Sequence, residues 1–372
     1  MPVAARQRES FVKTLLAWHR RHGRHDLPWQ REPTPYRVWV SEIMLQQTQV
    51  ATAIPYFQRF LNHFPDLESL AAGRIDEVLH HWSGLGYYAR ARNLHRTAGI
   101  IQQRHAGRMP EDLETLLGLP GIGRSTAGAI LALACGQRQP ILDGNVKRVL
   151  CRWAAIPGWP GQAAVQKRLW ALADALTPER HCGEYTQAIM DLGASLCRRA
   201  QPVCGHCPVA ATCRAFAQGR QGDYPASKPR RSIPLRQTRL ALIRNVQGSV
   251  LLEQRPPSGL WGGLWSLPEC PAGEEPSKWC QDYTGMSPSR ITTGTTFRHR
   301  FTHFHLDITP LLLQVDQNAG PVPGVMDVSA RVWYNSATGP VLGLPAPVSR
   351  LLQEPLMETP YDENGALCKT GP

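Results

Sequence analysis

Four cysteines within one short stretch constrain this chain more than any other feature. Six, two and five residues separate Cys197, Cys204, Cys207 and Cys213, and a Pro or Gly lies in each interval to turn the chain. Four thiolates so close together can enclose one tetrahedral metal centre. The spacing alone is compatible with a zinc ion or with an iron–sulfur cluster, so it predicts a metal-binding loop and leaves the metal open.

Cysteine chemistry depends on the compartment. The opening MPVAARQRES has no apolar signal core, and no stretch approaches the roughly 18 apolar residues of a membrane span. We therefore expect a cytoplasmic protein, associated with no membrane, in which thiols stay reduced. The other six cysteines have no ligand spacing and are expected to be inert: Cys135, Cys151, Cys182, Cys270, Cys280 and Cys368.

Hydrophobic spacing divides the chain into two parts. From about Gln7 to Gln218 apolar residues recur every three or four positions, which predicts helices without an intervening strand. A stretch rich in Pro, Ser and basic residues follows. Beyond it, short β-prone runs at 240–243 and 249–252 and a helix near 347–352 predict an α+β domain. We assign a helical domain to 1–219, a basic linker to 220–238, an α+β domain to 239–355 and a disordered tail to 356–372.

The charge indicates a class of partner. The chain has 41 Lys and Arg against 29 Asp and Glu, a formal net charge of +12. A polyanion would be attracted because phosphate contacts release counterions, although a basic surface can also serve solubility alone.

A glycine-rich turn in LLGLPGIGRSTA (116–127) separates two apolar helical stretches. Gly121 and Gly123 allow close approach of the backbone to a ligand, and the N–H groups that open the second helix suit a phosphate oxygen. Any helical hairpin can require glycine, so this turn is a modest signal by itself.

Two carboxylates stand out from their surroundings. Asp143 in ILDGNVKRV lies between an apolar run and a basic helix start, where it could be only a helix N-cap. Glu42 in SEIMLQQTQV has apolar neighbours, and burial would raise its pKa as a general acid requires, although a Glu on a helix is more often solvated. A third segment, WSGLGYYARARN, joins glycines, paired aromatics and Arg90 and Arg92, which could wedge a duplex and hold phosphates or simply pack.

These motifs together, over about residues 10 to 215, resemble the endonuclease III superfamily of helix-hairpin-helix glycosylases and, within it, the MutY-type adenine DNA glycosylases. The resemblance implies a [4Fe-4S] cluster on the four cysteines, Glu42 as general acid, and Asp143 facing the sugar with Asn145 in support. It implies DNA contacts from five further positions of the helical part: Gln47, which inserts into the base stack, Tyr87, which wedges it, and Gly121, Gly123 and Lys147 along the backbone. Ser125 in the hairpin helix is counted with the catalytic residues.

Ser125 bears on the type of chemistry. Relatives that also cleave the strand carry lysine there, and many MutY-type enzymes carry tyrosine. A hydroxyl cannot form an imine, so we expect a monofunctional glycosylase, with residual lyase action through Lys147 left open.

The second domain contains SGLWGGLWSLPE (258–269), which resembles a Nudix-like fold. A working Nudix hydrolase needs a REXXEE metal cluster, and only Glu274 and Glu275 lie close together here. Recognition is therefore the expected role. In FRHRFTHFHLD the alternation predicts an amphipathic strand, but Phe301, Thr302 and His303 also resemble the FSH loop that reads 8-oxoguanine, with Thr302 replacing serine.

The expected fold class is an all-helical helix-hairpin-helix domain with a [4Fe-4S] loop, followed by a Nudix-like α+β domain. The expected partner is double-stranded DNA with adenine opposite 8-oxoguanine or guanine, bound by a nucleoid-associated monomer. Two alternatives remain: a non-catalytic DNA-binding protein, which could dispense with either carboxylate, and an endonuclease III type of enzyme, which would need lysine in place of Ser125.

Overall fold

The computed structural model describes residues 4–229, 232–316, 330–336, 338–339 and 341–353. The chain divides into two compact units. The first unit comprises residues 1–73 and 90–230, and the second comprises residues 74–89 and 231–372. Segment 74–89 thus belongs with the C-terminal part, a grouping that the sequence analysis did not foresee. The tail predicted to be disordered lies outside the described residues, as does Cys368.

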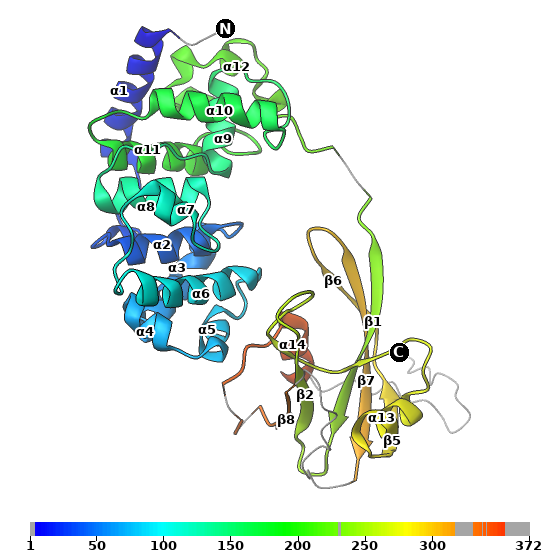
Figure 1. Ribbon diagram of the computed structural model, residues 1–372. Helices are drawn as coiled ribbons and strands as arrows, with labels where there is room; N and C mark the ends of the chain where they lie inside the picture. Colours follow the sequence, from blue (N-terminus) through cyan, green and yellow to red (C-terminus); the bar gives the residue numbers. More distant parts are fainter. Residues whose placement is uncertain (1–3, 230–231, 317–329, 337, 340, 354–372) are drawn as a thin grey trace. The chain divides into compact units, whose positions relative to one another are not determined.

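The first unit is helical over its described residues, as the periodicity predicts (Figure 1). Its helices are α1 (Ala5–His22), α2 (Pro35–Leu45), α3 (Val50–His63), α4 (Leu67–Ala72), α6 (Ala89–Arg104), α7 (Leu113–Leu117), α8 (Arg124–Cys135), α9 (Gly144–Trp153), α10 (Ala163–Leu176), α11 (Cys182–Ser195) and α12 (Arg214–Ala217), with short 3₁₀ turns at Pro28–Gln30, Cys204–His206, Ala210–Thr212 and Gln221–Asp223.

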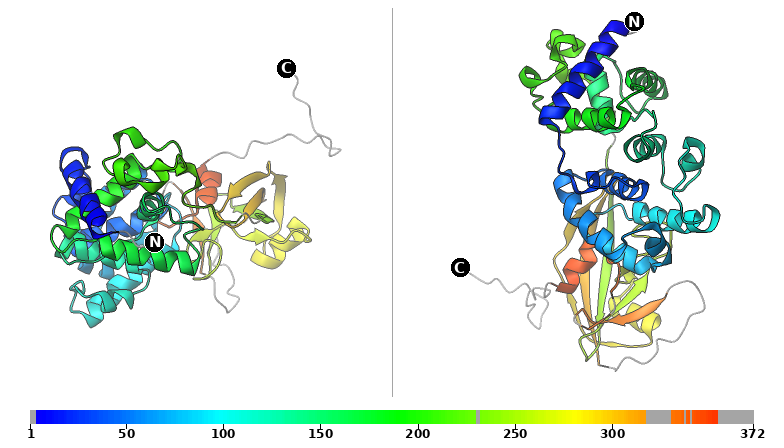
Figure 2. Two further views of the ribbon diagram at one scale, coloured as in Figure 1. Left: turned by 90° about the horizontal axis from the view of Figure 1, so that it is seen from above. Right: turned by 90° about the vertical axis from the view of Figure 1, so that its left-hand side faces the viewer.

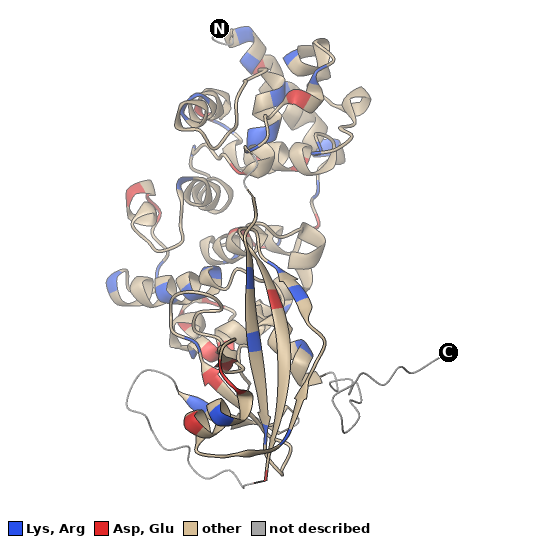
Figure 3. Cartoon of the chain, turned by 90° about the vertical axis from the view of Figure 1, so that its right-hand side faces the viewer, with Lys and Arg blue, Asp and Glu red and all other residues tan. Residues whose placement is uncertain are grey.

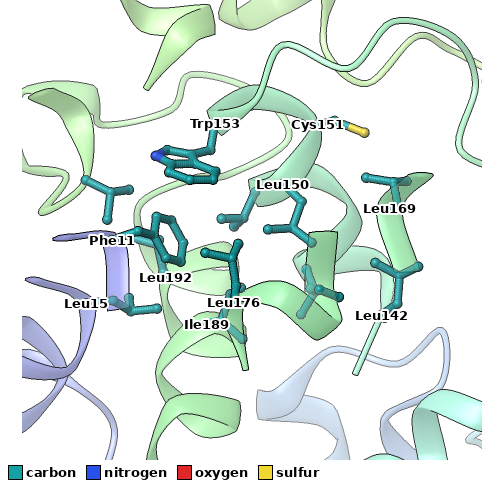
Figure 4. Packing of buried hydrophobic residues seen from close by; sticks show 14 of the residues in the cluster. Phe11, Leu15, Leu142, Leu150, Cys151, Trp153, Leu169, Leu176, Ile189 and Leu192 are labelled. Carbon is teal, nitrogen blue, oxygen red and sulfur yellow. The ribbon is translucent and has the colours of Figure 1, made fainter. Parts of the chain in front are cut away.

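Helix α9 crosses the hydrophobic core of this unit. Its apolar side chains point toward α1, α10 and α11, as the cluster around Trp153 shows (Figure 4). The Trp153 ring lies 4.6 Å from that of Phe11, and Leu150 and Leu192 are fully buried. Burial of side chains of this size stabilises by about 1.5–3 kcal/mol each, so the start of α9 is held against a rigid base.

The hairpin predicted from its glycines is present as α7, a tight turn and α8. Gly121 has φ +81°, a conformation that disfavours side chains, and a Cβ there would lie 2.9 Å from Cβ of Asn93. Gly128 in α8 lets the backbone approach closely, because a Cβ would lie 2.5 Å from the Pro140 carbonyl oxygen. The irregular segment that leads to Asp143 therefore packs directly on the hairpin helix.

The second unit contains eight strands among its described residues, in one mixed sheet (Figures 1 and 2). The order is β3-β2-β1-β7-β5, while β4 pairs with β1, β6 with β7 and β8 with β2. Only β1 and β7 pair in parallel, from Leu235 opposite His305 to Arg244 opposite Gln314. The elements are α5 (Ile75–Trp82), β1 (Leu235–Arg244), β2 (Val250–Gln254), β3 (Trp265–Ser266), β4 (Glu269–Cys270), α13 (Pro276–Thr284), β5 (Pro288–Thr293), β6 (Phe297–Arg300), β7 (His305–Val315), β8 (Arg331–Tyr334) and α14 (Ala346–Gln353).

Details differ from the sequence prediction for local reasons. Strand β1 begins at Leu235, inside the stretch predicted as linker, because main-chain pairing with β7 needs no apolar pattern. The alternating segment at 297–307 is two strands, β6 and β7, joined by a turn in which the Phe301 N–H donates to the Phe304 carbonyl. The predicted closing helix is α14. Within the described chain no helix is long and apolar enough to cross a membrane.

Candidate active site

Glu42 lies in the last part of α2, between the buried side chains Ser41 and Ile43. Part of the residue remains accessible to solvent, yet protein atoms surround its carboxyl group. Burial, the larger cause, and the charge of Asp143 together raise the pKa of Glu42 to about 8. At neutral pH Glu42 therefore holds a proton.

Asp143 is the N-cap of α9, and its Oδ1 accepts a hydrogen bond from the Val146 N–H at 2.7 Å. Burial raises the pKa of this carboxyl, while hydrogen bonds from the backbone of Val146 and Asn145 and the charges of Arg148 and Lys147 act to lower it. Of the two carboxyl groups, Asp143 alone has donors that favour the charged form. Burial raises the pKa of both groups, but only at Asp143 do hydrogen bonds and neighbouring charges counteract it.

Two polar residues from the sequence prediction surround Asp143. Ser125 Oγ accepts from the Leu142 N–H at 3.0 Å, so it ties α8 to the residue before Asp143. Asn145 Oδ1 accepts from Nη2 of Arg148 at 2.7 Å. Both contacts hold the start of α9 in place, and neither requires that Ser125 or Asn145 touch a substrate.

The four cysteines come together on one apolar pocket, which Val149, Leu192, Leu196 and Phe216 also line. Cys197, Cys204 and Cys213 raise the pKa of Cys207 electrostatically, and burial, the larger cause, takes it to about 12. Thiols this close and this buried can ionise only with compensating positive charge, which a metal centre would supply.

Arg148 and Arg152 join this pocket to the carboxylate end of α9, a connection that the sequence analysis missed. Arg148 Nε donates to the Cys197 carbonyl at 2.7 Å while its Nη2 holds Asn145. Arg152 is buried and donates to Cys197 Sγ at 3.4 Å and to the Arg198 carbonyl at 2.7 Å. The sequence did contain a signal for this connection: Asn145, Arg148 and Arg152 are three and then four residues apart, which places them on one face of a helix.

A basic groove of about 560 Å³ opens beside the first turn of α9. Lys147, Arg148, Arg199 and Lys228 line it together with Gly144, and no acidic side chain does. Figure 3 shows Lys and Arg on the helices of the first unit, and as bands along the strands of the second. This groove suits a phosphate backbone next to Asp143.

The two residues predicted to enter the base stack both have left-handed backbones. Gln47 has φ +59° in the first unit, and Tyr87 has φ +49° and a 43% exposed side chain in the second. Such conformations cost on the order of 1 kcal/mol or more and concentrate at functional turns. Arg90, for which the sequence left both phosphate contact and packing open, is buried and donates to the carbonyls of Ile43, Met44 and Gln46, because the last turn of α2 leaves them without helical partners.

Thr302 and His303 are exposed in the turn between β6 and β7, with Thr302 Oγ1 3.5 Å from His303 Nδ1. Phe301 and Phe304 stack at 4.5 Å and brace this turn from inside the unit. Glu275 accepts hydrogen bonds from the backbone of Ser277 and Lys278 as the N-cap of α13. This carboxylate is therefore occupied structurally, as expected of a domain without the Nudix metal cluster.

Comparisons with known proteins agree with this geometry. A family model for the HhH-GPD superfamily of base excision DNA repair proteins matches residues 40–175, and one for the NUDIX domain matches residues 239–354. An adenine DNA glycosylase of Buchnera aphidicola subsp. Acyrthosiphon pisum is 37% identical over 343 residues, which cover 92% of this chain and 97% of that protein. The chain belongs to the adenine DNA glycosylase family. It is a DNA glycosylase, with the helical and Nudix-like parts expected.

A further relative and two solved structures are also similar to this chain. The human adenine DNA glycosylase is 37% identical over 312 residues, 70% of this chain and 57% of the human protein. A thermostable thymine-DNA glycosylase superposes with a TM-score of 0.51 at 26% identity, over 57% of this chain and 98% of its own. An endonuclease III–DNA complex shares the fold at 18% identity and a TM-score of 0.50, over 59% of this chain and 99% of its own.

The protonation of Glu42 in this glycosylase should appear in its stability. The folded protein keeps the proton up to about pH 8 and the unfolded chain loses it near the ordinary value of 4.5, so this group's contribution to the free energy of unfolding is full below 4.5 and falls as the pH rises to 8. Glu42→Gln removes that dependence. The melting temperature of the variant minus that of the wild type should therefore be larger at pH 8.5 than at pH 5, by circular dichroism.

Glu68 of α4, which is exposed, provides the control for this measurement. The corresponding difference for Glu68→Gln should not change between the two pH values. A pH-independent difference for Glu42→Gln would mean that its carboxyl ionises at the ordinary pH.

Proposed function

We propose that this glycosylase removes adenine paired with 8-oxoguanine, or with guanine, from duplex DNA by hydrolysing the N-glycosidic bond. The observation that carries the proposal is the buried Glu42 carboxyl, whose pKa burial and the charge of Asp143 raise to about 8, together with an Asp143 carboxyl that accepts backbone hydrogen bonds at the start of α9. The family supplies the base: the relatives named above are adenine DNA glycosylases. Such a substrate places the protein with the nucleoid in the cytoplasm.

The two groups divide the chemistry. Adenine is a poor leaving group as an anion, so Glu42 donates its proton to N7 of the flipped base as the bond to the sugar breaks. Asp143, negatively charged, stabilises the oxocarbenium-like sugar or bonds to it transiently, and water completes the hydrolysis. The basic groove that includes Lys147 holds the adjacent phosphates, and the hairpin turn at Gly121 and Gly123 offers backbone N–H groups to others.

Substitution of either carboxyl group tests these roles. Glu42→Gln removes the proton donor and Asp143→Asn the negative charge, so each should slow single-turnover excision by about 100-fold or more while a fluorescent duplex still binds. Glu68→Gln is the matched control and should cut at the wild-type rate. Near-normal excision by either active-site variant would reject the assignment.

The absence of lysine in the hairpin helix supports hydrolysis without strand cleavage. Ser125 Oγ is engaged with the Leu142 N–H, and a hydroxyl cannot form the imine that a lyase step needs. We propose that Ser125 and Asn145 act by positioning Asp143 from its two sides.

We further propose that Cys197, Cys204, Cys207 and Cys213 hold a [4Fe-4S] cluster. Their thiols share one apolar pocket, and Arg152 and Gln221 donate to the sulfurs of Cys197 and Cys204. Spacing alone would also allow a zinc ion, and it is the resemblance of this spacing to the loop of the endonuclease III and MutY-type family that favours iron. When bound, the cluster would cross-link the loop that Arg148 and Arg152 attach to α9.

Metal analysis of anaerobically purified protein tests the cluster. It should contain about four irons per chain and absorb broadly near 410 nm. Cys204→Ser should lose most of the iron, whereas Cys182→Ser, a buried thiol away from the pocket, should keep it. Stoichiometric zinc without iron would overturn the proposal.

Recognition of 8-oxoguanine is assigned to the turn that presents Thr302 and His303. The lesion differs from guanine by a carbonyl oxygen and an N–H, so a few hydrogen bonds must discriminate, and each contributes about 0.5–1.5 kcal/mol. A hydroxyl and an imidazole exposed side by side can supply both a donor and an acceptor.

The double variant Thr302→Ala, His303→Ala should lower the preference for 8-oxoguanine. We expect its excision rate opposite 8-oxoguanine to fall about ten-fold more than its rate opposite guanine, since 1.4 kcal/mol corresponds to one decade. Ser289→Ala, an exposed hydroxyl on β5 of the same sheet, is the control. An unchanged ratio of rates would move recognition elsewhere.

A further inference from the structure

The segment that carries Tyr87 belongs structurally to the second unit. Residues 74–89, that is α5 and the loop after it, cluster with the residues from 231 onward, although the chain before and after this segment builds the first unit. Leu79, Trp82 and Leu85 are buried within it. We define the loop 83–88, which presents Tyr87, as the wedge loop.

The glycine-rich segment 261–265 is attached to α5 by one direct hydrogen bond and indirectly through Gly343. Trp265 Nε1 donates to Asp76 Oδ1 at 3.2 Å, near the start of α5. The Trp265 N–H also donates to the Gly343 carbonyl at 2.9 Å. Gly343 lies so close to the helix that a Cβ there would be 2.7 Å from Cβ of Leu79. The helix thus rests directly on backbone and has little room to shift.

The wedge loop itself is anchored through Tyr88. The Tyr88 hydroxyl donates to the Leu344 carbonyl at 3.2 Å and accepts from the Gly84 N–H at 3.5 Å, so one oxygen joins the loop to the segment 342–344. Trp82 Nε1 donates to the Gly86 carbonyl at 3.2 Å. These bonds hold a loop in which Gly84, Gly86 and Tyr87 all have positive φ. Such a backbone persists only where its surroundings determine it.

The other end of segment 261–265 lies beside residues 301–304, the turn between β6 and β7, which we call the recognition turn. The Trp261 ring lies 6.2 Å from that of Phe301 and 6.4 Å from that of His299, and Trp261 has φ +55°. Between the tryptophans the chain is a compact turn: the Leu264 N–H donates to the Trp261 carbonyl at 2.9 Å, and a Cβ on Gly262 would lie 2.6 Å from the Pro257 oxygen. Because segment 261–265 is so closely packed, a displacement of Trp261 at one end would move Trp265 at the other end.

We propose that segment 261–265 is a rigid link that couples the recognition turn to the wedge loop, so that reading of 8-oxoguanine positions Tyr87. In this arrangement Trp265 of the link and Tyr88 of the wedge loop are positioning residues for Tyr87. Trp261 is the residue of the link that contacts the recognition turn. This inference rests on the proposed function, because it requires that Thr302 and His303 meet the lesion and that Tyr87 enters the stack.

Variants that remove one polar group each test the link in the full chain. Tyr88→Phe keeps the ring and loses the hydroxyl, and Trp265→Phe loses the indole N–H while a smaller aromatic ring remains. The control for Trp265→Phe is Trp279→Phe, because the two tryptophans are similarly buried, at 8% and 7% exposed. The control for Tyr88→Phe is Tyr283→Phe, whose hydroxyl donates to Glu253 and not to a residue near α5. Single-turnover rates opposite 8-oxoguanine and opposite guanine give the preference. 2-Aminopurine beside the lesion, with Glu42→Gln added to prevent excision, reports unstacking by the wedge.

We expect Trp265→Phe and Tyr88→Phe to lower the preference for 8-oxoguanine about three- to ten-fold and to reduce the 2-aminopurine signal, and the two controls to do neither. A double-mutant cycle of Tyr87→Ala with Thr302→Ala should show coupling. The loss of preference for 8-oxoguanine in the double variant should be about five-fold smaller than the product of the two single losses. When Trp265→Phe is also present, the loss in the double variant should equal that product. The link would be overturned if the losses of preference from Tyr87→Ala and Thr302→Ala multiplied both with and without Trp265→Phe. It would also be overturned if Trp265→Phe and Tyr88→Phe both kept the wild-type preference and 2-aminopurine signal. A wild-type protein without preference for 8-oxoguanine would refute the proposed function instead.

Discussion

The attachment of the cysteine loop to helix α9 is the interaction on which the candidate site depends. Arg148 and Arg152 leave one helix and donate to the backbone and sulfur of the loop around Cys197, while the same helix begins at Asp143. Hydrogen bonds from charged groups contribute about 1.5–3 kcal/mol each, more than neutral ones. The loop that would hold iron and the carboxylate that would face the sugar are therefore parts of one rigid body, and distortion of the first would displace the second.

The two carboxyl groups of the candidate site, Glu42 and Asp143, are both buried, and burial alone would keep both neutral. Glu42 has only influences that favour its proton, whereas Asp143 has backbone N–H groups and two basic neighbours that favour its charge. The difference arises from position: Asp143 lies at a helix N-terminus, where amide dipoles favour negative charge, and Glu42 lies near a C-terminal end, where they disfavour it. Two similar side chains can thereby perform opposite tasks a short distance apart.

Sequence reasoning went furthest where chemistry is local. The spacing of the four cysteines, the N-cap position of Asp143 and the glycines of the hairpin each follow from a few neighbouring residues, and the structure places them in one loop, one helix start and one turn. Arg90 shows where such reasoning stops. Beside two aromatics it suggested a phosphate contact, but its partners are carbonyls more than 40 residues away at the end of α2.

The sequence by itself therefore indicated the family, the kinds of elements and the residues proposed to carry the chemistry, because periodicity and motif depend on neighbours along the chain. Only the tertiary structure decided that the charge of Asp143 acts on Glu42, that Arg148 and Arg152 bind the cysteine loop, and that residues 74–89 belong with the C-terminal sheet. These relations depend on which distant segments meet, and packing of whole units settles that, since no local pattern encodes the partner of a side chain across a core.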